Sequence, residues 1–168
     1  MKILVTGGAG FIGSHVVDAY ARAGHQVVVV DSLTRGRREQ VNAAARFYAT
    51  DIRSPQLREV FERERPDVVN HHAAQASVIV SINDPRADAD VNVLGTLNLC
   101  TLCVQFGVRR LIFASTGGAI YGASHDPIIA VWHPQTGRGT LHPLLRIRAD
   151  LGRAALRQRV RAEAGSAW

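Results

Sequence analysis

The sequence has no long apolar run, and none of its apolar stretches approaches the roughly 18 residues that a membrane span requires. It has no signal-peptide pattern either, so we expect a cytoplasmic protein without a membrane partner. Its only cysteines are Cys100 and Cys103, which excludes a disulfide-stabilised scaffold. Lysine is almost absent, since Lys2 is the single example among 168 residues. With 46% hydrophobic and 20% charged residues, the composition is that of an ordinary globular protein.

Positive charge is concentrated near the C-terminus. The formal net charge is +6, and residues 123–168 contain seven arginines but only three acidic residues. A charge run of this kind is usually solvated, so nucleic acid is not the expected partner. The alternative is a basic helix over 144–164 that contacts nucleic acid or an anionic surface.

A glycine-rich turn follows the first apolar stretch. Residues 3–13 read I-L-V-T-G-G-A-G-F-I-G, in which a strand buried on both faces leads into G-x-G-x-x-G. Glycine permits a positive φ, lets the backbone approach a pyrophosphate and lets the next helix pack closely on the strand. That helix begins near Phe11, and its free N–H groups and positive dipole end then face the phosphates.

A second strand over 26–30 ends in Asp31, which lies 18 residues past the last glycine of the turn. A carboxylate at this distance accepts hydrogen bonds from the ribose hydroxyls of a dinucleotide. Three arginines follow, Arg35, Arg37 and Arg38, and they would hold the 2′-phosphate of NADP. The carboxylate of Asp31 repels that phosphate, so the sequence favours NAD.

Strands and helices alternate over the rest of the N-terminal part. This alternation predicts a doubly wound parallel sheet, Rossmann-like, which binds its ligand at the carboxyl ends of the strands. The further strands are expected over 46–49, 67–70 and 110–114, and the helices over 11–24, 57–65 and 88–106.

Two short motifs lie at those carboxyl ends. Asp51 and Ile52 follow the third strand, where Asp51 either bonds an adenine amino group, with Ile52 packed on the ring, or caps the helix that begins near Pro55. The sequence leaves both roles open, and they are compatible. Ala73 and Ala74 follow the fourth strand, and residues this small let a cofactor lie against the backbone.

No metal site is expected. His71 and His72 are adjacent on an extended segment and point to opposite faces, and no carboxylate or thiol spacing completes a ligand set. Cys100 and Cys103 fall inside the last helix and are expected in the core rather than in redox or metal chemistry. Asn92 on the same helix either faces solvent or satisfies a buried partner near the cofactor.

Taken in order, these motifs resemble the NAD-dependent epimerase/dehydratase group of extended short-chain dehydrogenases/reductases, and within it the UDP-glucose 4-epimerases. The resemblance covers residues 1–122 and rests on T-G-G-A-G-F-I-G-S-H-V, Asp31 with S-L-T-R-G, Asp51-Ile52, H-H-A-A-Q, D-P-R-A-D-A-D-V-N-V-L-G-T-L-N-L and F-A-S-T-G-G-A-I-Y-G. It implies strand order 3-2-1-4-5, NAD as cofactor and a UDP-sugar as substrate. The residues that it implies for NAD are Gly7, Gly10, Phe11, Ile12, Asp31, Asp51, Ile52, Ala73, Ala74, Asn92 and Ser115.

The resemblance also implies a reaction. In the family, a tyrosine phenolate takes a proton from a sugar hydroxyl while hydride passes to NAD, and in the epimerases the hydride returns to the other face. Thr116 would donate a hydrogen bond to that hydroxyl. The tyrosine belongs to a Tyr-x-x-x-Lys motif, in which the ammonium favours the phenolate. Here no tyrosine follows Tyr121 and the only lysine is Lys2, so we expect a catalytically incomplete chain.

Residues 123–168 depart from the family pattern, because they lack lysine and tyrosine and are rich in arginine. The change predicts a reading-frame shift, or a natural truncation with a new tail before the substrate domain. We therefore expect an NAD-binding domain over 1–122 and a family-unlike tail over 123–168. A non-catalytic NAD-binding module is the alternative function. Apolar surface left uncovered by the absent strands would favour a homodimer.

Overall fold

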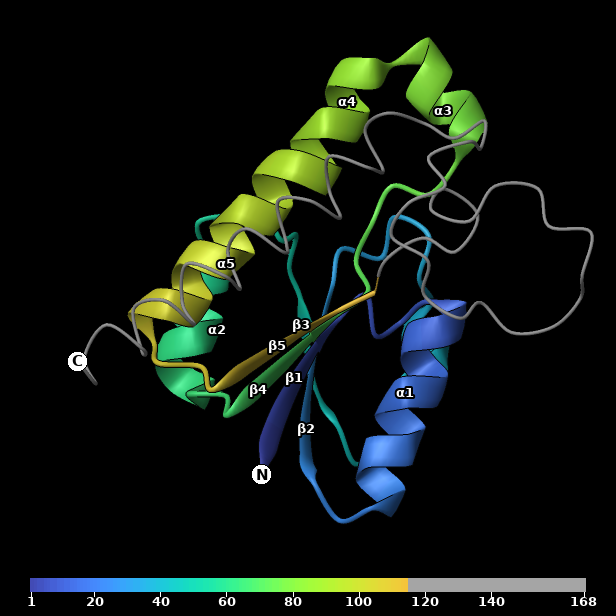
Figure 1. Cartoon of the computed structure of the whole chain (residues 1–168). Helices are drawn as coiled ribbons and strands as arrows, with labels where there is room; N and C mark the ends of the chain where they lie inside the picture. Colours follow the sequence, from blue (N-terminus) through green and yellow to red (C-terminus); the bar gives the residue numbers. More distant parts are fainter. Residues whose placement is uncertain (115–168) are drawn as a thin grey trace, which may run out of the picture.

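A computed structural model describes residues 1–114 of the chain. Predictions for Ser115, Thr116 and the tail over 123–168 lie outside the described residues. Five parallel strands form one sheet in the order β3-β2-β1-β4-β5, which confirms the predicted doubly wound arrangement (Figure 1). The strands are β1 (Lys2–Thr6), β2 (Gln26–Asp31), β3 (Arg46–Ala49), β4 (Val68–His71) and β5 (Arg110–Phe113).

Helices cover both faces of the sheet. Helix α1 (Phe11–Arg22) lies on one face, and α2 (Leu57–Glu64) and α5 (Thr96–Gln105) lie on the other (Figure 1). The remaining helical elements are the 3-10 turn η1 (Arg38–Gln40), α3 (Val78–Asn83), α4 (Pro85–Ala89) and the π-helical segment η2 (Asp90–Gly95). The helix expected over 88–106 is therefore a composite of α4, η2 and α5, and it begins a few residues earlier than predicted.

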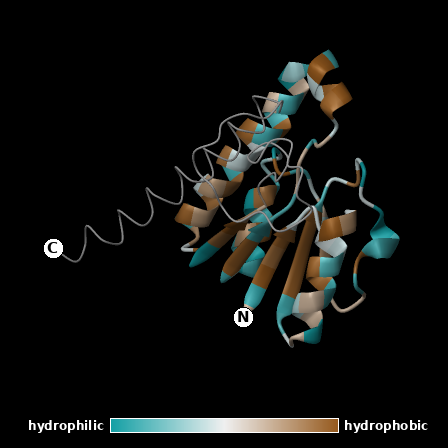
Figure 2. Ribbon diagram, turned by 45° about the vertical axis from the view of Figure 1, so that its right-hand side comes forward, coloured by the Kyte–Doolittle hydropathy of each residue, from teal (hydrophilic) through white to brown (hydrophobic). Residues whose placement is uncertain are grey.

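Strands β1 and β2 are apolar except at their ends, because both sides of the sheet are covered there (Figure 2). Successive side chains alternate between two cores. Leu4, Val28 and Val30 belong to the core beneath α2 and α5. Ile3 and Val29 belong to the core beneath α1. Continuous apolar runs in the sequence thus correspond to strands buried on both faces.

Glycine stops two helices where the sequence predicts it. Gly24 follows α1 with φ +77°, and its N–H donates to the carbonyl of Ala21 at 3.0 Å. Gly107 follows α5 with φ +66°. Both residues adopt the left-handed conformation that glycine tolerates without steric cost.

Helix α3 is not among the helices that the sequence predicts. Its residues, V-I-V-S-I-N, are mostly β-branched, which lowers helix propensity. Ser77 caps its start by accepting a hydrogen bond from the backbone N–H of Val80, and Ser81 donates to the buried carboxylate of Asp88 at 2.5 Å. A cap and a tertiary hydrogen bond therefore stabilise α3, and neither produces a periodic pattern in the sequence.

Both cysteines lie in the core, as predicted, with Cys100 6% and Cys103 3% exposed. Burial raises the pKa of the Cys100 thiol, because the thiolate would lose its solvation. Among residues 1–114, no helix is long and apolar enough to cross a membrane.

Candidate functional site

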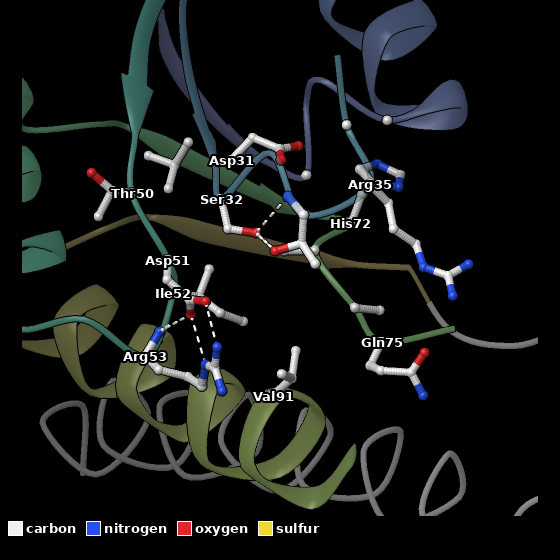
Figure 3. A pocket seen from close by; sticks show the side chains of 17 residues that line it. Asp31, Ser32, Arg35, Thr50, Asp51, Ile52, Arg53, His72, Gln75 and Val91 are labelled. Carbon is white, nitrogen blue, oxygen red and sulfur yellow. Dashed lines mark hydrogen bonds and ion pairs between the residues drawn. The ribbon is translucent and has the colours of Figure 1, made fainter. Parts of the chain in front are cut away.

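A pocket of about 220 Å³ opens at the carboxyl ends of the strands. Its walls come from stretches far apart in the sequence: the glycine-rich turn, the loops after β2, β3 and β4, and Val91 of η2 (Figure 3). Open parallel sheets bind ligands at this edge. The pocket brings together seven of the predicted site residues, namely Gly7, Gly10, Asp31, Asp51, Ile52, Ala73 and Ala74.

The glycine-rich turn lies between the exit of β4 and the start of α1. Gly7 has φ +69°, and a Cβ atom added there would lie 2.6 Å from the backbone nitrogen of Ala73. A Cβ on Gly13 would lie 2.1 Å from the carbonyl oxygen of Gly7. Only glycine fits at these two positions, so the sequence requirement follows from close backbone packing.

Helix α1 leaves its first N–H groups open. Its N-cap is Gly10, no side chain caps it, and its first turn contains no acidic residue. Free N–H groups and the positive end of the helix dipole make such a terminus suitable for an anion such as a diphosphate.

The carboxylate of Asp31 fixes the turn and lines the pocket. Its Oδ2 accepts a hydrogen bond from the backbone N–H of Ala9 at 3.0 Å, and its Oδ1 accepts one from Leu33 at 2.8 Å. An ionised carboxylate has about four acceptor positions, so each oxygen of Asp31 keeps one open. Two adjacent acceptors match the two hydroxyls of a ribose diol.

The three arginines after β2 do not form one cluster at the pocket. Arg35 lines the pocket, whereas Arg37 and Arg38 do not. The guanidinium of Arg38 lies 4.6 Å from the centre of the Phe47 ring. A 2′-phosphate beside Asp31 would therefore meet one arginine rather than three.

Asp51 is held by Arg53 instead of capping α2. Its Oδ1 accepts from the backbone N–H and the Nε of Arg53 at 2.8 and 2.9 Å, and its Oδ2 accepts from Nη2 at 2.7 Å. Helix α2 itself has no side-chain cap. The hydrogen bonds from Arg53 hold the pKa of the Asp51 carboxyl below its ordinary value. Ile52 beside it is buried and lines the pocket.

Asn92 is fully buried and holds one wall of the pocket. Its Oδ1 accepts from the backbone N–H of Gln75 at 3.0 Å, and its Nδ2 donates to the carbonyl oxygen of Gln75 at 2.8 Å. Of the two roles open in the sequence, Asn92 therefore satisfies a buried partner. Phe11 and Ile12 lie at the start of α1 with 76% and 64% of their surface exposed, and they do not line the pocket. Their contact with a cofactor stays a prediction.

The two adjacent histidines have different environments. His71 is fully buried, and its ring nitrogens lie 2.6 Å from Oγ1 of Thr6 and 3.1 Å from Oγ1 of Thr96. His72 lines the pocket. Within residues 1–114, no group of three or more His, Cys, Asp or Glu side chains is placed to hold a metal ion.

Sequence reasoning missed Arg53, Gln75 and Val91 as residues of this site. A signal for two of them was present, because Arg53 follows Asp51-Ile52 directly and Val91 precedes Asn92. Their position in the pocket depends on how the loop after β3 approaches η2, which no local pattern shows.

The family model of the NAD dependent epimerase/dehydratase family matches residues 3–143. The chain belongs to this family. The match runs past residue 122, the boundary predicted for the NAD-binding domain, and that boundary stays a prediction. NAD, the expected cofactor, is the cofactor of the family.

Members of this epimerase family resemble the chain in sequence and in structure. A putative UDP-glucose 4-epimerase of Methanocaldococcus jannaschii is 44% identical over 132 residues, which are 79% of this chain and 43% of that protein. The UDP-glucose 4-epimerase of Mycolicibacterium smegmatis is 42% identical and matches 73% of this chain and 41% of its own length. The chain thus spans about two fifths of these relatives.

A solved structure shows the same arrangement. The UDP-glucose 4-epimerase of Thermus thermophilus in complex with NAD has a TM-score of 0.81 at 42% identity, covering 98% of this chain and 51% of that one. The enzyme of Thermotoga maritima with UDP-glucose has a TM-score of 0.78 at 40% identity, covering 94% and 52%.

Proposed function

We propose that the chain binds NAD as the cofactor-binding part of a nucleotide-sugar epimerase or dehydratase similar to UDP-glucose 4-epimerase. The observation that carries the proposal is the Asp31 carboxylate, which is fixed against the glycine-rich turn and keeps one open acceptor on each oxygen. A ribose diol fits this pair of acceptors, and the uncapped start of α1 lies beside it for the diphosphate.

The other walls fit the remaining parts of NAD. Asp51 and Ile52 would hold the adenine, and the small Ala73 and Ala74 admit close approach to the backbone. Bound NAD would supply a hydride acceptor for the sugar carbon that is oxidised in the family reaction. Phe11, Ile12, Asn92 and Ser115 are proposed as further cofactor contacts, and Thr116 as a hydrogen-bond donor to the sugar hydroxyl.

We further propose that this polypeptide does not complete the sugar reaction. The sequence has no tyrosine after Tyr121, and its single lysine is Lys2. Lys2 lies at the start of β1, opposite the carboxyl ends, and its Nζ is paired with Glu64 at 3.2 Å. An ammonium at that edge is not available to stabilise a phenolate at the pocket. A non-catalytic NAD-binding module, completed by a partner chain, is the alternative.

The test is calorimetric titration of the purified chain with NAD and NADP. We expect NAD to bind at least about tenfold more tightly, because the 2′-phosphate would face Asp31. Absence of NAD binding would overturn the proposal. Incubation with NAD and UDP-glucose tests the second part, with two readouts: the absorbance of reduced nicotinamide and the formation of the 4-epimer of the sugar. Turnover by either readout would show that the chain is catalytically complete.

We also propose that the chain self-associates through its composite helix and works in the cytoplasm. Leu94, Leu97 and Val104 are large apolar side chains exposed on η2 and α5. Two free, buried thiols fit a reducing compartment. Sedimentation should show a dimer, and a monomer at high concentration would contradict the proposed association.

A further inference from the structure

Arg53 connects two walls of the pocket that are far apart in the sequence. Its Nη1 donates to Oδ2 of Asp90 at 2.6 Å. Its Nη2 donates to Oδ2 of Asp51 at 2.7 Å (Figure 3). Asp51 follows β3, whereas Asp90 begins the π-helical segment η2, one residue before Val91 of the pocket. One guanidinium therefore fixes the spacing between these walls.

The hydrogen bonds from Arg53 determine how many acceptor positions remain open on the Asp51 carboxylate. Three N–H groups of Arg53 occupy two acceptor positions on Oδ1 and one on Oδ2. A carboxylate has about four such positions, so one acceptor position remains, and it is on Oδ2. The planar fork of the guanidinium also fixes the plane of the carboxylate.

Stability alone does not explain this arrangement. All three side chains are at least partly exposed, and exposed ion pairs contribute little to folding. Pairing with Asp51 and Asp90 nevertheless raises the pKa of Arg53, so the guanidinium stays charged at any physiological pH. The hydrogen bonds of the Arg53 guanidinium therefore fix the orientation of Asp51 and add little to the free energy of unfolding.

We propose that Arg53 is a positioning residue that presents the one open acceptor of Asp51 to the exocyclic amino group of adenine. The inference rests on the proposed NAD-binding function and adds the residue that selects the base. A carboxylate only accepts hydrogen bonds, so it favours an amino group and repels a carbonyl oxygen at the same place. The pocket should therefore discriminate adenine from hypoxanthine, and this discrimination should depend on Arg53.

The experiment compares the binding of NAD and of nicotinamide hypoxanthine dinucleotide to the full chain by calorimetry. The wild-type chain should bind NAD about tenfold more tightly, the value of one charged hydrogen bond. Arg53→Met keeps the aliphatic stem but releases Asp51, so the ratio of the two affinities should fall toward unity. Arg53→Lys should lower the ratio in the same direction, because an ammonium cannot form the fork.

Arg109→Met is the matched control. Arg109 pairs with Asp67 at 2.8 Å through an exposed guanidinium, at the amino-terminal ends of the strands and away from the pocket. The Arg109→Met variant should bind NAD and nicotinamide hypoxanthine dinucleotide with the affinities of the wild-type chain. Circular dichroism establishes that each variant is folded, and Arg53→Lys carries the test if Arg53→Met does not fold.

The outcomes separate the inference from the function on which it rests. If a folded Arg53 variant weakens both dinucleotides by the same factor and keeps the wild-type ratio, Arg53 is merely structural and the inference is wrong. A wild-type chain that binds both dinucleotides equally would also overturn the inference, while NAD binding itself stands. If the wild-type chain binds neither, the proposed function fails and the inference fails with it.

Discussion

The carboxylate of Asp31 accepts a buried hydrogen bond from the backbone N–H of Ala9 at 3.0 Å, although the two residues lie 22 positions apart. This bond ties the end of β2 to the glycine-rich turn. Because Asp31 also lines the pocket, one side chain determines both the shape of the turn and the acceptors that a ligand meets.

Replacement of Asp31 by Asn should therefore affect binding and stability together. An amide has one acceptor oxygen in place of two, so either Ala9 or Leu33 loses its partner. We expect a loss of about 1–3 kcal/mol in unfolding free energy and a fall of at least about tenfold in NAD affinity. Urea unfolding and calorimetry measure the two effects. Glu39→Gln, at an exposed acidic residue of η1, is the control, and an unchanged affinity of Asp31→Asn would contradict the assignment.

Alanine should be tolerated very differently at two glycines. At Gly13 the new Cβ would meet the carbonyl oxygen of Gly7 at 2.1 Å, so we expect Gly13→Ala to cost about 3 kcal/mol or more. At Gly24 no atom lies within 4 Å of the added Cβ, so only the positive φ is unfavourable. We expect Gly24→Ala to cost about 1 kcal/mol in unfolding free energy. Urea denaturation of both variants checks the order, and equal costs would show that the turn does not pack as described.

Glu64 should make stability depend on pH. Its carboxylate is 1% exposed and accepts hydrogen bonds from Tyr48, Arg46 and Lys2 at 2.5, 2.7 and 3.2 Å. Burial by itself raises the pKa of Glu64, but these three donors outweigh burial and leave the pKa below its ordinary value of 4.5. The folded chain thus prefers the ionised form, which stabilises it above the ordinary pKa. This contribution is lost as the pH falls through the lowered pKa.

Glu64→Gln should accordingly cost about 2 kcal/mol at neutral pH, and the difference from the wild type should narrow as the pH falls below about 4. Thermal or urea unfolding over a pH series measures this. Glu59→Gln, at an exposed residue of the same helix, should show no such narrowing. If the unfolding free energies of the wild type and Glu64→Gln differ by the same amount at every pH, the ionised Glu64 carboxylate does not contribute the stability described.

The thiols should be unreactive in the folded chain. Cys100 and Cys103 are buried, and the pKa of Cys100 is raised, so little thiolate is present or accessible. A chromogenic disulfide reagent should react with both thiols only across the urea range in which circular dichroism reports unfolding. Fast reaction of either thiol in buffer would contradict the burial of α5.

Much of the sheet could be predicted because burial on both faces leaves runs such as residues 27–30, in which every residue is valine. The position of Asp31 after that run predicted the acceptor at the pocket. The π-helical segment η2 could not be predicted, because one extra residue hardly disturbs the apolar spacing of a long helix. Gly95 ends this segment at a close contact, since a Cβ added there would lie 2.7 Å from Cδ1 of Ile52.

Arg53 shows the other limit of sequence reasoning. An arginine two residues after an aspartate is usually solvated. Its second partner, Asp90, lies 37 positions away, and only the folded chain brings the two together. Site residues that directly follow a strand, such as Asp31, could be found in the sequence, whereas the contact between the loop after β3 and η2 could not.

The pocket has no continuous counterpart in the chain, since its walls come from loops separated by whole strands and helices. A ligand of this pocket can therefore recognise only the assembled sheet, and its binding is thermodynamically linked to folding. Bound ligand adds to the free energy of unfolding in proportion to the logarithm of its concentration above Kd. In a cell, the supply of such a ligand would thus set how long the folded chain survives proteolysis.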